Sequence, residues 1–497
     1  MNILLMGMPD IGSGYPTKLL STPNLGLSSI AANLDKKHSV KIADLVLRRT
    51  DVKEAINEAL DEAAPDIVGL SAMTFQYKTS LRIAAYIKRR EPRIKIALGG
   101  YHATLLFEEI AESPDAALFD LLFRGESDLS FNEAVNALEE GTDLSEVDGI
   151  SFKRKGRFIH NRPRALEDLT QIKLPSRRAR IWNDFNVLKV PWDLIEFSRG
   201  CLMSCNFCNI RNMYGRSFRA YQMERVMMDI AQAKREGTKI LLFVDDNITT
   251  DVKLFENLCD AILNHNHNDL IYGVQASSRG IASSETLAAK MAEAGFKYVY
   301  LGIESPSKKN LAEWNKGDIV ENSKMAVGYL KKYGISVAGG FIIGNPDDDL
   351  EMVEATFKFA KSLRTDFSAV QILMPYHKTK IRERLMQDGL VVRPDDYEMY
   401  DGGHPVIRTH FLDEDQLFRA KYRFGNQYLG VRAWDVIKTL FKHGKTSLPF
   451  LPGALKMIPK ALDSLTWGWI KKLVLNEKKR FDRYWKGELT LNKFDID

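Results

Sequence analysis

Two successive series of alternating strand and helix signals set the narrowest limits on how this chain can fold. In each series, short apolar segments bounded by turn residues alternate with amphipathic helical segments. This alternation is typical of parallel sheets covered by helices. The first series spans about residues 1–145 and the second begins at Asp193. We therefore expect an α/β protein with two sheets, in a chain whose 497 residues leave room for about three domains.

The first series predicts a doubly wound, Rossmann-like sheet over residues 1–145. Helical patterns such as Leu25–Leu34 and Thr79–Arg90 separate its strands. Ligands of such sheets bind at the carboxyl ends of the strands, and here those ends carry small and polar residues. The predicted strands are Asn2–Met8, Val40–Leu45, Asp66–Met73 and Lys95–Gly100.

The second series predicts a partial barrel. Six strand-plus-helix units lie within residues 191–385, fewer than the eight that close a TIM barrel. An open, partial (β/α)6 TIM barrel fits this number, and its strand ends carry polar and glycine-rich residues where barrel active sites lie. The predicted strands are Leu194–Ser198, Ile240–Asp245, Ile271–Ala276, Tyr298–Glu304, Val337–Ile343 and Ala369–Met374.

The two remaining parts of the chain break the alternation. Residues 146–190 are rich in Arg and Lys, contain Pro163 and Pro175, and predict a connecting segment. Residues 386–497 predict a helical region rich in basic and aromatic side chains. Within it, residues 436–486 hold 12 Lys or Arg and three Asp or Glu. This stretch suits either a helical cap on the barrel or an amphipathic element that contacts anionic lipid headgroups.

Composition narrows the class of protein. The chain is 45% hydrophobic and 27% charged, the balance of a globular protein. It has no signal-peptide pattern and no apolar stretch of membrane-spanning length, so we expect a cytoplasmic location. The net charge is +5, of which residues 436–486 contribute +9 (12 minus three) and the rest about −4. Without a recognition motif, this balance argues against nucleic acid as a partner.

Three of the four cysteines lie within eight residues. Cys201, Cys205 and Cys208 fall in the segment SRGCLMSCNFC (198–208), in a predicted loop after the first strand of the second series. Such clustering is typical of a metal site in a reducing compartment rather than of a disulfide framework. The C-x3-C-x2-C spacing lets three thiolates hold three corners of a [4Fe–4S] cluster, leaving the fourth iron open to a small molecule.

A structural zinc site is the alternative for these cysteines. Zinc would need a fourth ligand, and the nearest histidines in sequence are His160 and His265. The fourth cysteine, Cys259, sits in a helical stretch and resembles a small buried hydrophobe. The sequence therefore favours the cluster.

The cysteine motif, with Phe207 before the third cysteine, resembles that of the radical S-adenosylmethionine (SAM) superfamily. Three further segments match in order, each at a predicted strand end: FVDDN (243–247), GIES (302–305) and GFIIG (340–344). The resemblance covers about residues 190–385 and implies that a [4Fe–4S] cluster binds SAM. Acidic side chains suit the ammonium and ribose of SAM, and an arginine could contact its carboxylate. The candidate SAM contacts are Phe207, Asp245, Asp246, Arg279, Glu304, Gly340 and Gly344.

The first domain resembles the cobalamin-binding domain that precedes the barrel in one large subgroup of that superfamily. The segments that carry the resemblance are PNLGLSSIAA (23–32), VGLSAMT (68–74), GGYHAT (99–104) and GES (125–127). Small residues at strand ends let the backbone approach a flat corrin ring. The candidate cobalamin contacts are Ser71, Thr74, Gly99, Gly100, His102, Gly125 and Glu126.

One motif of other cobalamin proteins is missing. Their D-x-H-x-x-G loop supplies an axial histidine, whereas the segment DIGSG (10–14) holds none. His102 is then the only histidine at a predicted strand end, and we favour a structural role for it. We therefore expect no protein ligand on the lower face of the cobalt.

These resemblances imply an enzyme that cleaves SAM reductively and removes hydrogen from an unactivated carbon. We favour cobalamin-dependent methylation of a hydrophobic small molecule, with flavodoxin or ferredoxin as electron donor and peripheral membrane contact through residues 436–486. The alternatives are oxidative cyclisation, as in the anaerobic magnesium-protoporphyrin ester cyclases that the layout resembles, and a non-catalytic sensor. The segment MPYHKT (374–379) departs from the family's P-x-P-G-T pattern, which leaves the substrate contacts there open.

Overall fold

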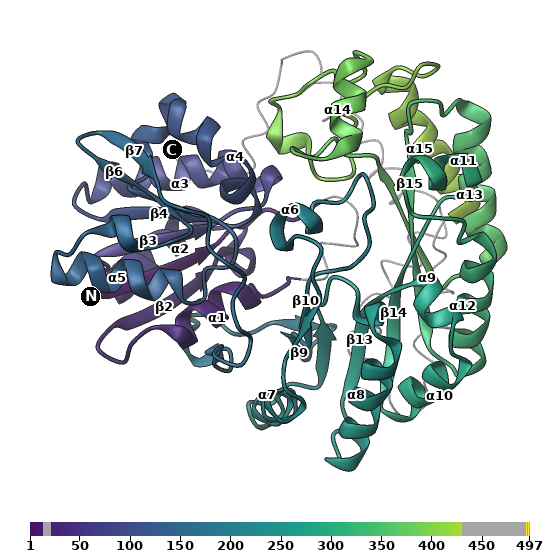
Figure 1. Ribbon diagram of the computed structural model, residues 1–497, viewed down its shortest axis with the longest axis horizontal. Helices are drawn as coiled ribbons and strands as arrows, with labels where there is room; N and C mark the ends of the chain where they lie inside the picture. Colours follow the sequence, from purple (N-terminus) through teal and green to yellow (C-terminus); the bar gives the residue numbers. More distant parts are fainter. Residues whose placement is uncertain (13–20, 430–493, 495, 497) are drawn as a thin grey trace.

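The computed structural model describes residues 1–12, 21–429, 494 and 496. It confirms the predicted α/β class, because a helix-covered sheet at the N-terminal side stands beside a curled half barrel (Figure 1). Each unit contains a seven-stranded sheet.

The first sheet has the order β2-β1-β3-β4-β5-β6-β7. Its first five strands are parallel, and the order reverses between β1 and β3, which creates the crevice where ligands of doubly wound sheets bind. The parallel strands are β1 (Asn2–Gly7), β2 (Ser39–Asp44), β3 (Ile67–Ser71), β4 (Lys95–Gly99) and β5 (Leu121–Phe123).

Helices cover both faces of this sheet, which explains why its strands are almost continuously apolar. Leu27 and Phe131, from α1 and α5, pack on one face, whereas Ile56 and Ile83, from α2 and α3, pack on the other. The helices are α1 (Leu25–Asn33), α2 (Val52–Ala63), α3 (Tyr77–Arg90), α4 (Tyr101–Glu112) and α5 (Ser130–Glu140).

The sheet continues into residues 146–190, the predicted connecting segment. The hairpin β6 (Ile150–Arg154) and β7 (Arg157–His160) adds two antiparallel strands to the edge at β5. In β6 the alternation of buried and exposed side chains is short, with Ile150 and Phe152 as the buried apolar residues.

The half barrel has the order β16-β15-β14-β13-β12-β9-β8. Six strands are parallel as predicted, and β8 (Asn186–Val187) pairs antiparallel at the edge. The parallel strands are β9 (Val190–Ile195), β12 (Ile240–Phe243), β13 (Ile271–Ser277), β14 (Phe296–Glu304), β15 (Ser336–Ile343) and β16 (Phe367–Ile372). Figure 1 shows the longer helices on the outer side of this sheet. They are α7 (Met223–Arg235), α8 (Val252–Asn264), α10 (Glu285–Glu293), α12 (Val320–Lys332) and α13 (Leu350–Leu363).

The first barrel strand begins earlier than predicted. We expected Leu194–Ser198, but β9 covers Val190–Ile195, and Ser198 starts a separate short strand. The additional residues include Pro191, although proline usually interrupts a strand. Here it lies near the start of β9, opposite the two-residue edge strand β8, where the loss of one donor is tolerated.

The C-terminal part adds α14 (Lys380–Gln387) and α15 (Glu414–Leu429), and α15 packs against α13 and β16. Residues 436–486, with the predicted basic and aromatic stretch, lie outside the described residues. In the described part of the chain, no helix is both long and apolar enough to cross a bilayer.

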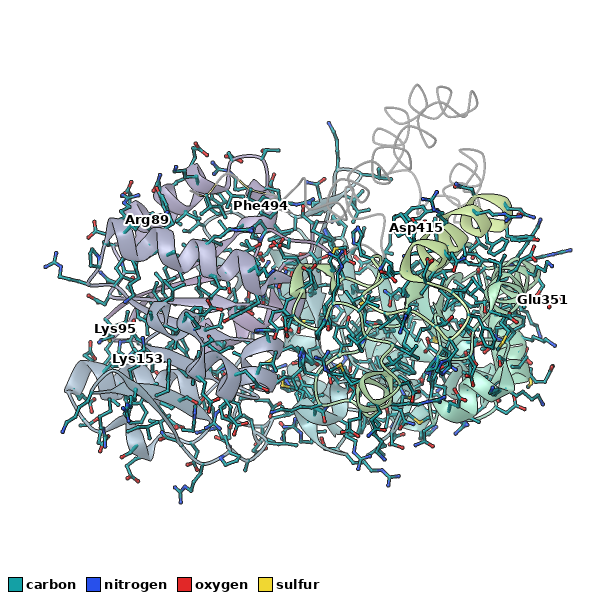
Figure 2. The ribbon with its side chains drawn as sticks, turned by 90° about the horizontal axis from the view of Figure 1, so that it is seen from above. Arg89, Lys95, Lys153, Glu351, Asp415 and Phe494 are labelled. Carbon is teal, nitrogen blue, oxygen red and sulfur yellow. The ribbon has the colours of Figure 1, made fainter. Side chains whose placement is uncertain are left out.

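The first sheet points its carboxyl ends toward the half barrel. Figure 2 shows Lys95, at the start of β4, on the side of the molecule farthest from the half barrel. Arg89, near the end of the antiparallel α3, lies at the same side (Figure 2). The ligand-binding edge of the first sheet therefore faces the second unit.

Candidate functional site

The three clustered cysteines lie on a loop whose base is closed by a small ladder. β10 (Ser198–Arg199) enters the loop and pairs antiparallel with β11 (Arg219–Ala220), which leaves it. Between them, Gly200 has φ +87° and approaches Ser217 so closely that a Cβ atom would lie 2.4 Å from the Ser217 carbonyl oxygen. Only glycine fits that position. The helix α6 (Ile210–Tyr214) follows the third cysteine and lies between the two units (Figure 1).

A second segment holds the middle of the loop. It consists of residues 313–317, which begin at the last residue of the short helix α11 (Lys308–Glu313). The Asn206 backbone N–H donates to the Trp314 carbonyl at 2.9 Å, and the Asn206 side chain donates to the Glu313 carbonyl at 2.6 Å. Asn315 donates to the Ser204 hydroxyl at 2.7 Å. These contacts fix the loop between its first and third cysteines.

All three cysteines border one cavity of about 510 Å³ beside the ends of the barrel strands. Four of the seven candidate SAM contacts border it as well. These lining residues are Cys201, Cys205, Cys208, Phe207, Asp246, Arg279 and Glu304. The cavity also has polar lining residues that the sequence motifs did not single out. Among them are Thr249, Gln275, Ser277, Tyr300 and Lys316.

The other three candidate SAM contacts do not border the cavity. Asp245 is buried and accepts hydrogen bonds from the Ser198 hydroxyl and the Phe197 backbone N–H, and burial raises its pKa to about 7. A Cβ atom at Gly340 would lie 2.3 Å from the Tyr300 hydroxyl oxygen, so this glycine makes room for a lining side chain. Gly344 has φ +90° and packs against Leu417 and Ile407.

Charged groups in the cavity are held by specific partners. Asp246 accepts the Gly200 backbone N–H at 2.9 Å, and burial raises its pKa to about 6. Glu304 accepts from the Lys316 ammonium at 2.8 Å. Burial alone would lower the pKa of Lys316, but the Glu304 carboxylate outweighs it and raises that pKa. The Arg279 guanidinium lies where a side chain at Gly317 would be, 2.7 Å from the ideal Cβ position.

The thiols fit a cluster better than a zinc ion. Cys259 is fully buried in the apolar core of the half barrel, on α8, and does not line the cavity. Within the described ranges, no three Cys, His, Asp or Glu side chains converge on one metal ion. A cubane instead takes each thiolate on a different iron. Burial raises the pKa of the Cys208 thiol to about 12.

In the first domain, the candidate cobalamin residues lie at or just after the carboxyl ends of β3, β4 and β5. Gly100 has φ +93°, and a Cβ atom there would lie 2.7 Å from the Ala72 carbonyl oxygen. Ala72 in turn donates to the Gly99 carbonyl at 3.0 Å, which ties the loops after β3 and β4 together. Thr74 is buried beside them, and the Ser71 hydroxyl lies 3.5 Å from the Asn24 amide.

His102 occupies an aromatic cluster. It is 1% exposed, stacks on Tyr77 at 3.9 Å between ring centroids, and meets the edge of Tyr397 at 4.8 Å. Neither ring nitrogen has a hydrogen-bond partner within the described chain. Burial lowers the pKa of His102 to about 3, so the ring stays neutral. These contacts fit the structural role that we favoured.

Glu126 joins the two units rather than facing an open crevice. It accepts from Arg199 at 3.0 Å and from Arg219 at 2.8 Å, both at the base of the cysteine loop. Asp128 accepts from Arg199 as well, at 2.8 Å. All except Arg219 are buried. Gly125, with φ +73°, precedes this network.

Tyr101 brings the crevice of the first domain next to the cavity. It follows Gly100 directly and begins α4, which contacts α6 of the cysteine loop. Burial raises the pKa of the Tyr101 hydroxyl, and the nearby Tyr214, Asp246 and Cys208 raise it further. The segment GGYH therefore lies close to the helix that follows the third cysteine.

Comparison with known proteins decides the family. Residues 195–360 match the family model "Radical SAM superfamily", and residues 19–135 match the model "B12 binding domain". An uncharacterised methyltransferase of Pyrococcus horikoshii is 32% identical over 89% of this chain and 95% of its own length. The chain belongs to the radical SAM superfamily. Its B12-binding domain places it with the cobalamin-dependent radical SAM methyltransferases and the related cyclases, and it is a radical SAM enzyme.

Two other members extend the comparison. The anaerobic magnesium-protoporphyrin IX monomethyl ester cyclase of Rubrivivax gelatinosus is 24% identical over 82% of this chain and 73% of its own length. The radical SAM methyltransferase TsrM of Kitasatospora setae, solved with tryptophan and a SAM analogue, superposes with a TM-score of 0.64 at 17% identity, over 79% of this chain and 77% of TsrM. Another TsrM structure contains cobalamin and a [4Fe–4S] cluster. This likeness shows that the radical SAM enzyme described here shares the two-domain fold.

Proposed function

We propose that this chain is a cobalamin-dependent radical SAM methyltransferase whose Cys201, Cys205 and Cys208 hold a [4Fe–4S] cluster. The observation that carries the proposal is the single cavity bordered by the three thiols and by charged groups suited to SAM. When bound, a reduced cluster and SAM supply a 5′-deoxyadenosyl radical that removes hydrogen from an unactivated carbon. The protein's own part is to orient the reactants and to exclude water.

The lining residues divide the recognition of SAM among them. In this proposal Arg279 pairs with the SAM carboxylate, and Asp246 accepts from its ammonium or ribose; both residues line the cavity. Phe207, held edge-on against Trp314 at 5.8 Å between ring centroids, offers an apolar surface close to the cysteines. Asp245, Gly340 and Gly344 support this site from behind the wall: they hold the lining backbone in place without touching SAM.

We propose that cobalamin binds in the crevice of the first domain. Ser71, Thr74, Gly99, Gly100 and Gly125 form its floor, and His102 and Glu126 serve packing and domain contact instead. The contact of α4 with α6 supports this assignment, because it puts the strand ends of the first domain next to the cysteine loop. A methyl group carried on cobalamin would then be close to a substrate radical.

Methylation and cyclisation are separated by the origin of the product's carbon atoms. Cells with and without the gene, fed methionine labelled with ¹³C at its methyl group, should differ in a labelled compound of the lipid or pigment extract. A new but unlabelled compound would favour cyclisation. Cluster-loaded protein that forms no 5′-deoxyadenosine from SAM under dithionite would indicate a sensor and refute the enzyme proposal.

We further propose a cytoplasmic enzyme that takes electrons from flavodoxin or ferredoxin and reaches a hydrophobic substrate at a membrane surface. The support is the excess positive charge of residues 436–486, where each cation near an anionic bilayer contributes roughly 1 kcal/mol. Full-length protein should float with anionic liposomes at low salt and be released by high salt, because salt screens exposed charges. Protein that stays at the bottom of the gradient at low salt would refute the membrane contact.

A further inference from the structure

We propose that Lys316 is the fixed positive charge that makes the cluster easier to reduce, and that Glu304 is the residue that positions its ammonium. This inference rests on the proposed function, since it assumes a cluster on the three cysteines. It concerns the segment WNKG (314–317), which lies after a helix and not at a strand end.

The ion pair is enclosed and held in one arrangement. The Lys316 Nζ and Glu304 Oε1 atoms are 2.8 Å apart, and the two side chains are 14% and 12% exposed. Glu304 has φ +66°, a conformation that non-glycine residues keep only when their surroundings enforce it. The pairing of β14 with β15 is irregular at the same point, between Gly302 and Glu304.

Gly302 leaves the space that the pair occupies. A Cβ atom at this position would lie 2.9 Å from Glu304 Oε1 and 3.3 Å from Lys316 Nζ. The glycine of the GIES segment therefore lets the ammonium lie over the backbone of β14, inside the wall of the cavity.

The same segment ties Lys316 to the cysteine loop. Its neighbours Trp314 and Asn315 hydrogen-bond to Asn206 and Ser204, and the Lys316 backbone N–H donates to Leu311. The ammonium thereby stays in the wall of the cavity that Cys205 and Cys208 also line.

Charge explains what such an ammonium does. Three thiolates make the bound cluster anionic, and accepting one electron adds a further negative charge. Because the Lys316 side chain is only 14% exposed, solvent screens its charge weakly, and such a nearby cation stabilises the reduced form more than the oxidised form. The Glu304 carboxylate acts in the opposite direction, so the potential depends on both members of the pair.

The test is a redox titration of full-length protein with a reconstituted cluster, with dithionite as one-electron donor and the reduced cluster followed by EPR. Lys316→Met should keep the wild-type iron and sulfide content but shift the midpoint potential to more negative values. At the wild-type midpoint, the ratio of reduced to oxidised cluster should fall about tenfold, which corresponds to 59 mV for one electron. Lys316→Arg keeps the positive charge, so its midpoint potential should lie close to that of the wild type.

Lys308→Met is the matched control, because it removes the same charge from a side chain that is 76% exposed and paired with Asp318. Its potential should equal that of the wild type. Glu304→Gln should move the potential in the positive direction, and it remains informative if Lys316→Met fails to retain a cluster.

Two results would overturn the proposal: equal potentials in wild type, Lys316→Met and Glu304→Gln, or a shift of either variant in the wrong direction. Failure of the proposed function looks different, because the wild type itself would then assemble no cluster on its cysteines.

Discussion

The strand ends of the half barrel and those of the first domain were expected to play the same part, yet the protein uses them differently. In the half barrel, the polar side chains at the strand ends border an open cavity. In the first domain, His102 is enclosed by aromatic rings and Glu126 is paired with two arginines of the other unit. A motif at a strand end therefore predicts which edge of a sheet binds a ligand. Contacts with the neighbouring domain determine which side chains of the motif remain available to that ligand.

The largest expected effect tests the half-barrel side of this comparison. Cys205→Ala should abolish the cluster, which in the wild type contains about four irons and four sulfides per chain, and with it all formation of 5′-deoxyadenosine. Cys259→Ala should leave both intact, because Cys259 packs in the core away from the cavity. Iron and sulfide analysis of anaerobically reconstituted protein measures the difference. Stoichiometric zinc in place of iron would contradict the assignment.

The next effect tests whether Glu126 serves domain contact. Glu126→Ala removes one carboxylate from both Arg199 and Arg219. Breaking a buried ion pair costs about 3–5 kcal/mol, and because Arg199 keeps Asp128 and Glu196, we expect a loss at the lower end of this range. Urea unfolding of cofactor-free protein should show a loss of this size, whereas Glu109→Ala, at an exposed position of α4, should show almost none. If Glu126→Ala left the stability unchanged but abolished cobalamin binding, Glu126 would be a cobalamin contact and not a domain contact.

A smaller effect concerns pH and Asp245, at the base of the cysteine loop. Burial raises the pKa of this carboxyl from 3.8 to about 7, so the folded protein binds a proton that the unfolded chain has released. The free energy of unfolding should therefore fall as pH rises from about 4 to about 7. Between pH 5 and pH 7 this contribution amounts to about 3 kcal/mol at most.

Asp245→Asn removes that proton equilibrium while keeping the shape of the side chain. The difference in unfolding free energy between wild type and variant should change with pH in this window and level off above it. Chemical denaturation at several pH values provides the measurement, and parallel profiles for the two proteins would show that the carboxyl titrates normally.

The smallest effect concerns the cobalt. His102→Phe preserves the stack on Tyr77 and removes two buried nitrogens that lack partners in the described chain, so stability should change by less than about 1 kcal/mol. Cobalamin should still bind, and the EPR spectrum of its cobalt(II) form should show no nitrogen splitting in either protein. Nitrogen splitting that disappears in the variant would make His102 the axial ligand.

Periodicity and short motifs predicted the α/β class, the six parallel barrel strands and the cysteine loop, because these depend on local patterns of apolar and ligand residues. They missed features that depend on distant partners. The contact between Glu126 and Arg199 joins residues 73 positions apart. The segment WNKG (314–317) carries no signal of its own, since its importance comes from the loop that it braces. Asp245 and Gly340 matched the motifs but do not border the cavity.

The arginines at the base of the cysteine loop also limit how the two domains can be exchanged between related enzymes. A first domain cut at residue 145 would lose the hairpin β6–β7 and would leave Glu126 and Asp128 without their counterions. A chimera that grafts this domain onto a foreign barrel would need arginines equivalent to Arg199 and Arg219 in the recipient. The junction for such a graft should lie beyond residue 160. On a barrel that lacks these two arginines, the grafted domain should be weakly attached and variably oriented.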